Sequence, residues 1–159
     1  HCVHCPKEEE DLIKKNGVYI AHCPTSNSNI ASGICPAGRY LRQGYKIGLG
    51  SDISGGHTLD LFEVMRHAIQ VSKQRMRYVD PNEVSLTMTE TLFMTSNGGG
   101  SFFGKVGTFE NEYEFDAIVL DESTIPSARQ YNDKERLERF IYHKNSKIES
   151  KFIRGNKIF

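Results

Sequence analysis

Two short apolar segments, residues 18–23 and 46–50, constrain the fold more than any other feature of the sequence. A compact apolar run that ends at a Pro or Gly is typical of a strand buried on both faces of a parallel sheet. Helical patterns lie before, between and after the two segments, which predicts an α/β structure. Because two strands cannot form a sheet that buries both its faces, we expect missing N-terminal strands in a longer polypeptide.

Helices are expected over residues 6–16, 59–77 and 81–96, where apolar residues recur at helical spacing or acids precede bases. Thr58 is the expected cap of the long helix. The glycine run 98–100 is expected to end the third helix. Residues 39–44 could add one or two helical turns.

The character of the sequence changes after residue 101. A strand is predicted over residues 115–121, a charged helix over 133–144 and a hairpin within 153–158. These elements predict a small β-rich unit. We therefore divide the chain into residues 1–103, with the strands and helices of the α/β structure, and residues 104–159, a β-rich flanking domain with one helix.

Charge and cysteine content exclude some classes of partner. Lys plus Arg and Asp plus Glu both number 20, so no broad electrostatic field favours nucleic acid or a membrane surface. No apolar run approaches the roughly 20 residues that span a bilayer. All four cysteines fall in the first quarter of the chain, unlike a disulfide framework. Reduced thiols predict a cytoplasmic protein.

Asp52 is the strongest candidate for chemistry. It follows the buried segment 46–50 and precedes a Gly-Gly turn, a position from which a carboxylate can bind a metal or act as a base. The alternative is that Ser51 and Asp52 only cap the next helix. His22 ends the other buried segment, where a packed histidine is the commoner outcome.

The segment between the two strands is rich in Ser, Asn, Gly and Pro and predicts a long loop. Loops of this length in compact domains are often functional. Residues 25–37 are expected to line the pocket, with Ser26, Asn27 and Asn29 as candidate binding residues. The alternative is that these polar side chains only satisfy backbone groups.

A second class of function comes from the first five residues. His1, Cys2, His4 and Cys5 form a Cys-x-x-Cys cluster, which is half of a structural zinc site. Cys23 and Cys35 are twelve residues apart and do not supply the other half. A small Cys/His zinc-binding module is therefore the less favoured alternative.

Several stretches, in order along nearly the whole chain, resemble the amidohydrolase superfamily. They are His-Cys-Val-His at the start, AHCPTSNSNI at 21–30, KIGLGSDISGG at 46–56, LDLFEVMRHAIQVSK at 59–73, GKVGTFENEYEFDAIVLD at 104–121 and the closing FIRGNKIF. Within the superfamily they look most like the guanine deaminases. Chlorohydrolase-like deaminases and cytosine or adenosine deaminases are the nearest alternatives.

The resemblance implies the C-terminal part of a TIM-type (β/α)8 barrel with pieces of a small flanking β-sandwich domain. Asp52 matches the eighth-strand Asp that binds the metal, Zn²⁺ or alternatively Fe²⁺, and contacts the substrate. His1 matches the sixth-strand catalytic His, and His22 matches a position that is not a metal ligand. The family's His-x-His pair and fifth-strand His are absent here.

The chemistry implied is hydrolytic deamination of guanine to xanthine and ammonia by a metal-activated water. Asp52 and His1 would be the catalytic residues. The expected partner is a small-molecule purine, and the family tendency is a homodimer. With one carboxylate for a metal, this piece alone is expected to be inactive.

Overall fold

The computed structural model describes residues 1–143 and 147–159. Its centre is a parallel pair of short strands, β1 (Ile20–His22) and β2 (Ile47–Leu49). Ile20 lies opposite Ile47 and His22 opposite Leu49, so both strands end at the same edge. Ile20 and Ile47 are 3% and 1% exposed. The prediction of two parallel strands is confirmed, but β1 is buried on one face only, because Ala21 is exposed.

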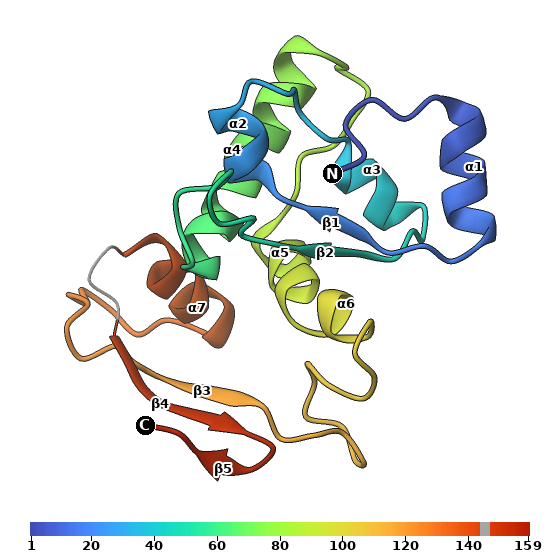
Figure 1. Cartoon of the computed structure of the whole chain (residues 1–159). Coiled ribbons are helices and arrows are strands. Elements are labelled where there is room, and N and C mark those ends of the chain that lie inside the picture. The colour runs from blue at the N-terminus through green and yellow to red at the C-terminus, as the bar shows by residue number, and fades with distance from the viewer. Residues whose placement is uncertain (144–146) are drawn as a thin grey trace.

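Three helices come from the segments around this strand pair. Helix α1 (Lys7–Lys15) precedes β1, with acids in its first turn and lysines in its last, as the helix dipole favours. Helix α2 (Pro24–Asn29) follows β1 directly, and α3 (Ala37–Arg42) leads back to β2. Figure 1 shows α1 and α3 on one side of the strand pair and α2 beyond the end of β1.

The prediction of an uninterrupted loop between the strands was wrong for residues 24–29. Pro24 occupies the start of α2, where its missing N–H costs nothing. Thr25, Ser26 and Asn27 are buried although they are polar and are poor helix formers. Tertiary contacts therefore hold this helix, and single-sequence propensity cannot detect them.

The long helix α4 (Leu61–Tyr78) crosses beside the strands and buries Val64, Met65, Ala68 and Ile69. Its cap is Asp60, which accepts from the amide of Phe62, and not Thr58 as predicted. The hydroxyl of Thr58 instead accepts from the amide of Asp60. The cap was misplaced by two residues because both side chains fit the capping pattern.

Helix α5 (Met88–Thr95) begins at a capping box between Thr87 and Glu90, so the predicted helix was right only for its second half. The glycine run was predicted to end this helix, but α5 ends before it, and the run itself forms a short helix, α6 (Asn97–Gly100). A Cβ on Gly48 of β2 would lie 2.6 Å from the Cα of Gly99. The glycines are needed here because two backbones approach closely. In the sequence alone, such a glycine run looks the same as one that ends a helix.

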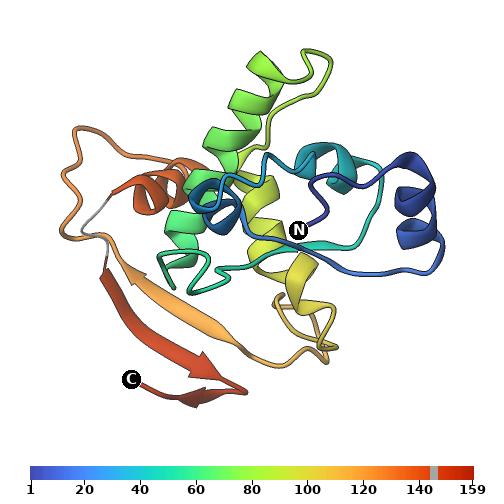
Figure 2. The ribbon, with the colours of Figure 1, turned by 45° about the horizontal axis from the view of Figure 1, so that its top comes forward.

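The remaining elements form a second sheet. Strands β3 (Ala117–Asp121), β4 (Lys147–Ile153) and β5 (Asn156–Lys157) pair antiparallel in that order. Helix α7 (Asp133–Tyr142) packs on α4 through Phe140 and Phe62, whose ring centroids are 5.5 Å apart. Figures 1 and 2 show this sheet standing apart from β1 and β2. One sheet of three strands does not confirm a sandwich, and Lys144, the predicted end of the helix, lies outside the described residues.

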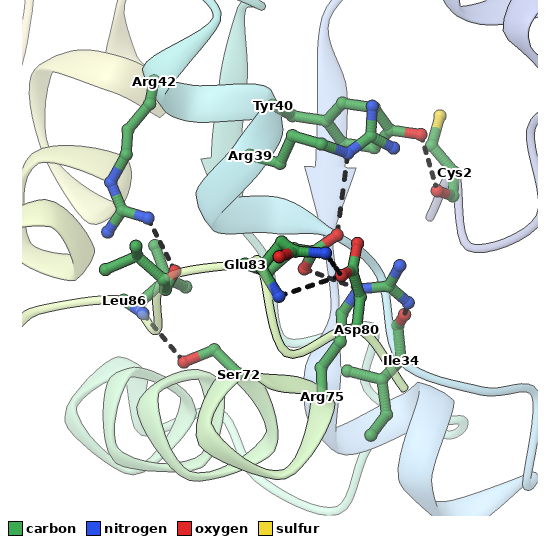
Figure 3. Close-up of polar contacts among 12 residues, drawn as sticks. Cys2, Ile34, Arg39, Tyr40, Arg42, Ser72, Arg75, Asp80, Glu83 and Leu86 are labelled. Carbon is green, nitrogen blue, oxygen red and sulfur yellow. Dashed lines mark hydrogen bonds and ion pairs between the residues drawn. The ribbon is translucent and has the colours of Figure 1, made fainter. Parts of the chain in front are cut away.

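A network of charged side chains joins α1, α3 and α4. Figure 3 shows its part around Arg39, Arg75 and Glu83. Arg39 donates two hydrogen bonds to Glu10 at 2.7 and 2.9 Å and lies 3.6 Å from Glu83. Arg75 of α4 donates to Glu83 at 2.7 Å and to the carbonyl of Ile34 at 2.7 Å. Glu10 is 5% exposed, so its charge depends on Arg39.

Replacing Glu10 by Gln is expected to destabilise the protein by about 1.5–3 kcal/mol at pH 7, the value of a hydrogen bond to a charged group. The Arg39 guanidinium lowers the pKa of Glu10. A lowered folded-state pKa stabilises the fold above the unfolded pKa of about 4.3, and this contribution disappears as the pH falls through the folded pKa. The difference between wild type and Glu10→Gln should therefore be large at pH 7 and should shrink below about pH 4.

Urea denaturation at pH 7 and at pH 3 measures this difference. Glu8→Gln is the matched control, because Glu8 is on the same helix but exposed. An equal loss of stability for both variants at pH 7 would contradict the role given to the Arg39 pair.

Candidate active site

The connections after β1 and β2 leave the strand pair at the same edge. After β1 the chain enters α2, and after β2 it enters a polar turn at residues 51–56. The amide of Gly50 donates to the carbonyl of His22 at 3.0 Å, which extends the strand pairing to the start of this turn. Carboxyl ends of parallel strands are the usual place for active-site residues in α/β folds.

Asp52 projects from this turn with a side chain that is 42% exposed. Its φ of 46° is in the left-handed region, which Asp tolerates better than most residues. Ser54 has a φ of 95°, and the amide of Gly56 closes the turn by donating to the carbonyl of Asp52 at 2.6 Å. The alternative that Asp52 caps the next helix was wrong, because Asp60 caps α4.

His1 lies against Asp52. Its Nε2 is 3.5 Å from Oδ2 of Asp52, and its Nδ1 is 2.6 Å from Oδ1 of Asn27 on α2. The two residues that the sequence predicted as catalytic are thus neighbours, although they lie far apart along the chain. Asn27, predicted only as a candidate lining residue, holds the far side of the His1 ring.

The polar residues of α2 fasten the helix to the rest of the site. The side-chain amide of Asn29 donates to the carbonyl of Gly55 at 2.9 Å, and Ser28 is 2.7 Å from Nε2 of His67 on α4. A Cβ on Gly55 would lie 2.5 Å from the hydroxyl oxygen of Ser26. The prediction that this segment lines the site is supported by these contacts, and the glycine turn is required for its close approach.

His22 is fully packed beneath the site, with 1% of its surface exposed. Burial lowers its pKa to about 3, so it is neutral at physiological pH. Its Nδ1 has no hydrogen-bond partner among the described residues. These properties agree with the prediction that His22 is a packed residue.

The described residues contain no group of three or more His, Cys, Asp or Glu side chains that could hold a metal ion. The alternative of a zinc module at His1, Cys2, His4 and Cys5 is therefore unsupported. Nε2 of His4 instead lies 2.8 Å from the carbonyl of Ser32, and burial raises the pKa of the Cys5 thiol to about 11. The same finding means that Asp52 and His1 do not complete a metal site by themselves.

An apolar groove lies away from these residues. It is lined from β1, β2, α4, α5, α6, β3 and β4, with Leu49, Phe102 and Phe109 among its lining residues, and does not include His1, Asn27 or Asp52. Phe102 and Phe109 are 62% and 76% exposed. The polar site and the apolar groove are thus separate parts of the surface. No helix in the described ranges, 1–143 and 147–159, has the length and apolarity needed to cross a membrane.

Comparison with known proteins shows that the chain belongs to the amidohydrolase family. The model of the amidohydrolase family matches residues 1–158. Guanine deaminase of Dictyostelium discoideum is 34% identical over 99% of this chain and 37% of its own length. The guanine deaminase of C. acetobutylicum, solved with guanine in its active site, is 48% identical with a TM-score of 0.92, and the match covers all of this chain and 38% of that one.

A more distant match is the adenosine deaminase of Xanthomonas campestris, solved with bound zinc, which is 25% identical with a TM-score of 0.80 over 99% of this chain and 35% of that one. The chain therefore spans little more than a third of the relatives that it matches. These comparisons do not confirm the predicted position of the chain at the C-terminal end of such a protein.

The 51–56 turn gives a direct test of how tightly the site is packed. A Cβ on Gly56 would lie 2.1 Å from the carbonyl oxygen of Ser51 and 2.8 Å from Oγ1 of Thr25. Gly56→Ala is expected to cost at least about 1–3 kcal/mol, as overpacking does in well-packed interiors.

Thermal unfolding of wild type, Gly56→Ala and Gly50→Ala measures the effect. A Cβ on Gly50 would meet only the Cys23 thiol, at 3.1 Å, and a side chain can yield where a backbone cannot. A midpoint for Gly56→Ala at or above that of Gly50→Ala would show that the turn is not held as described.

Proposed function

Since the chain belongs to the amidohydrolase family, we propose that it supplies part of the active site of an aminohydrolase that converts guanine and water into xanthine and ammonia. The observation that carries the proposal is the meeting of His1 and Asp52, 3.5 Å apart, at the strand edge. The 48% identity to a guanine deaminase solved with guanine bound supports guanine as the substrate.

The described residues supply only part of the ligand set that a metal ion needs. The exposed carboxylate of Asp52 is an oxygen donor of the type that Zn²⁺ accepts. We propose that Asp52 is one ligand of Zn²⁺ and that the others come from residues outside these 159, since the described part of the chain holds no complete set of ligands. A carboxylate ligand fits Fe²⁺ equally well. When bound, the metal would lower the pKa of water and polarise the purine.

Asp52 and His1 then have distinct tasks. Asp52 would bind the metal with its carboxylate and accept a hydrogen bond from the attacking water. His1, whose Nε2 lies 3.5 Å from the Asp52 carboxylate, would pass the proton on to the purine ring and the leaving amine. Both side chains are nearly half exposed in this chain. Proton transfer by positioned groups of this kind contributes roughly 10²–10⁴-fold to a rate.

The wider proposal concerns the whole protein. We propose that β1 and β2 are two strands of a TIM-type barrel, that residues 1–103 belong to it and that residues 104–159 form a flanking domain. The antiparallel sheet of β3, β4 and β5 supports this division. Four free cysteines support a cytoplasmic location. A homodimer that binds neither nucleic acid nor membrane completes the proposal, with the zero net charge as support for the second part.

Deamination of adenine derivatives is the second candidate, because a zinc-containing adenosine deaminase shares the fold at 25% identity. The two candidates use the same residues on this chain. They differ in the ring position that loses its amine. Ammonia release from guanine and from adenosine, measured side by side, separates them.

Replacing Asp52 by Asn in the metal-loaded full-length protein is expected to lower kcat for guanine by at least about 10²-fold, since both a ligand and a proton acceptor are lost. Metal content per chain should fall in the same variant. The measurement is ammonia release together with metal analysis.

Asp60→Asn is the matched control, because Asp60 caps α4 and Asn caps equally well. Its activity and metal content should stay at the level of wild type. Near-normal turnover by Asp52→Asn, with the control also normal, would end the assignment of the active site to this turn.

A further inference from the structure

The contact between His1 and Asn27 assigns a role that neither the family match nor the relatives' names give. Nδ1 of His1 is 2.6 Å from Oδ1 of Asn27, and Nε2 on the other side of the ring is 3.5 Å from Asp52. Asn27 therefore holds one ring nitrogen, and the Asp52 carboxylate lies beside the other. The partner of each ring nitrogen decides whether that nitrogen bears a proton, because a neutral imidazole has one N–H and one lone pair.

We propose that Asn27 is a positioning residue that keeps a proton on Nδ1 of His1 and fixes the orientation of the ring, so that Nε2 faces Asp52 and the reacting atoms. A side-chain carbonyl oxygen can only accept, so Oδ1 requires the proton on Nδ1. Nε2 is then the ring nitrogen that exchanges protons with the site, because it is the one that faces the Asp52 carboxylate. This inference rests on the proposed function only for its effect on turnover, since the tautomer can be measured without it.

Asn27 is well placed for such a role because it is held firmly. It is 2% exposed, and its backbone amide donates to the carbonyl of Cys23 in the first turn of α2. The amide of Ser32 donates back to the carbonyl of Asn27 at 2.9 Å. A side chain fixed in this way orients its partner more precisely than a mobile loop residue would.

Helix α2 is in turn anchored on both sides. Ser28 contacts His67 of α4, and Asn29 donates to the carbonyl of Gly55 in the turn that carries Asp52. The same short helix thus sets the distance between the two groups that hold His1. A change in α2 would move the His1 ring and the Asp52 turn together.

The amide nitrogen of Asn27 also bears on this role. Its Nδ2 is buried and has no hydrogen-bond partner among the described residues. A buried donor without a partner costs about 1–3 kcal/mol. An apolar side chain of similar size would avoid this cost, so stability alone does not explain an amide here. The contact that the amide does make, from Oδ1 to His1, explains why an acceptor is needed at this place.

The backbone of the segment supports the same geometry. Cys2 has a φ of 47°, and its carbonyl lies 3.3 Å from the hydroxyl of Tyr40, a residue that is 1% exposed. The main chain next to His1 is therefore fixed to α3 while the ring is fixed to α2. His1 reaches Asp52 as a constrained group and not as a flexible side chain.

Two substitutions in the metal-loaded full-length protein test the proposal. Asn27→Leu keeps the size of the side chain and removes the acceptor, whereas Asn27→Asp keeps an acceptor oxygen. Asn27→Leu is expected to lower kcat for guanine by roughly 10–100-fold, the usual effect of losing a partner that orients a site histidine. KM and metal content should change little, and Asn27→Asp should recover most of the lost kcat.

The decisive readout is spectroscopic. Two-dimensional ¹H–¹⁵N NMR of the histidine rings distinguishes the Nδ1–H from the Nε2–H tautomer. Nδ1 of His1 should carry a proton in wild type and in Asn27→Asp, and should lose it in Asn27→Leu, where the ring shifts toward the Nε2–H form. Thr91→Val is the matched control, because it also replaces a buried polar side chain by an apolar one, on α5 away from the site. This control should leave the tautomer and kcat unchanged.

An unprotonated Nδ1 in wild type, or an Nδ1 that stays protonated in Asn27→Leu, would overturn the proposal. So would a loss of kcat in Asn27→Leu that Asp does not recover and that follows loss of metal, since that pattern describes a structural role. If the protein does not deaminate guanine at all, the NMR measurement still decides whether Asn27 sets the tautomer. The two hypotheses therefore fail separately.

Discussion

The site depends on the parallel pairing of β1 and β2 more than on any side-chain contact. The register sets His22 opposite Leu49, so the chain leaves both strands at one edge. A shift of one residue would turn every side chain of a strand to the other face. The turn that carries Asp52 would then no longer face α2. The buried isoleucines Ile20 and Ile47, which lie opposite each other, stabilise the register on which the site depends.

Unsatisfied and strained groups gather at the edge of this strand pair. Nδ1 of His22, Oγ1 of Thr25 and Nδ2 of Asn27 are buried with no partner among the described residues, and Asp52 and Ser54 are in the left-handed region. Groups of this kind cost free energy and are often found at functional sites. Their concentration at one edge agrees with a site in which geometry is maintained at the expense of stability.

Sequence reasoning was most successful where a pattern has a local physical cause. The buried strands were predicted because an uninterrupted apolar run this short is usually a buried strand, and Asp52 because a polar turn follows one of them. It failed where tertiary contacts decide the structure. Helix α2 has weak intrinsic propensity, and the glycines of α6 resemble a helix breaker until the neighbouring backbone at Gly48 is known. Helix α1 is a further example: Leu12 and Ile13 are adjacent apolar residues, but Leu12 is 58% exposed and only Ile13 packs on the core.

The pairing of His1 with Asn27 could not have been predicted from local patterns at all. They are 26 residues apart, and the polar segment that carries Asn27 offers several equivalent side chains. Only the fold shows that Asn27 faces the His1 ring, Asn29 the Gly55 carbonyl and Ser28 the α4 surface. This division of tasks among neighbouring residues follows from helical geometry, since successive residues of a helix point about 100° apart. A loop of the same composition would not hold three partners in three fixed directions, so the tertiary contacts that make this segment a helix also set the geometry of the site.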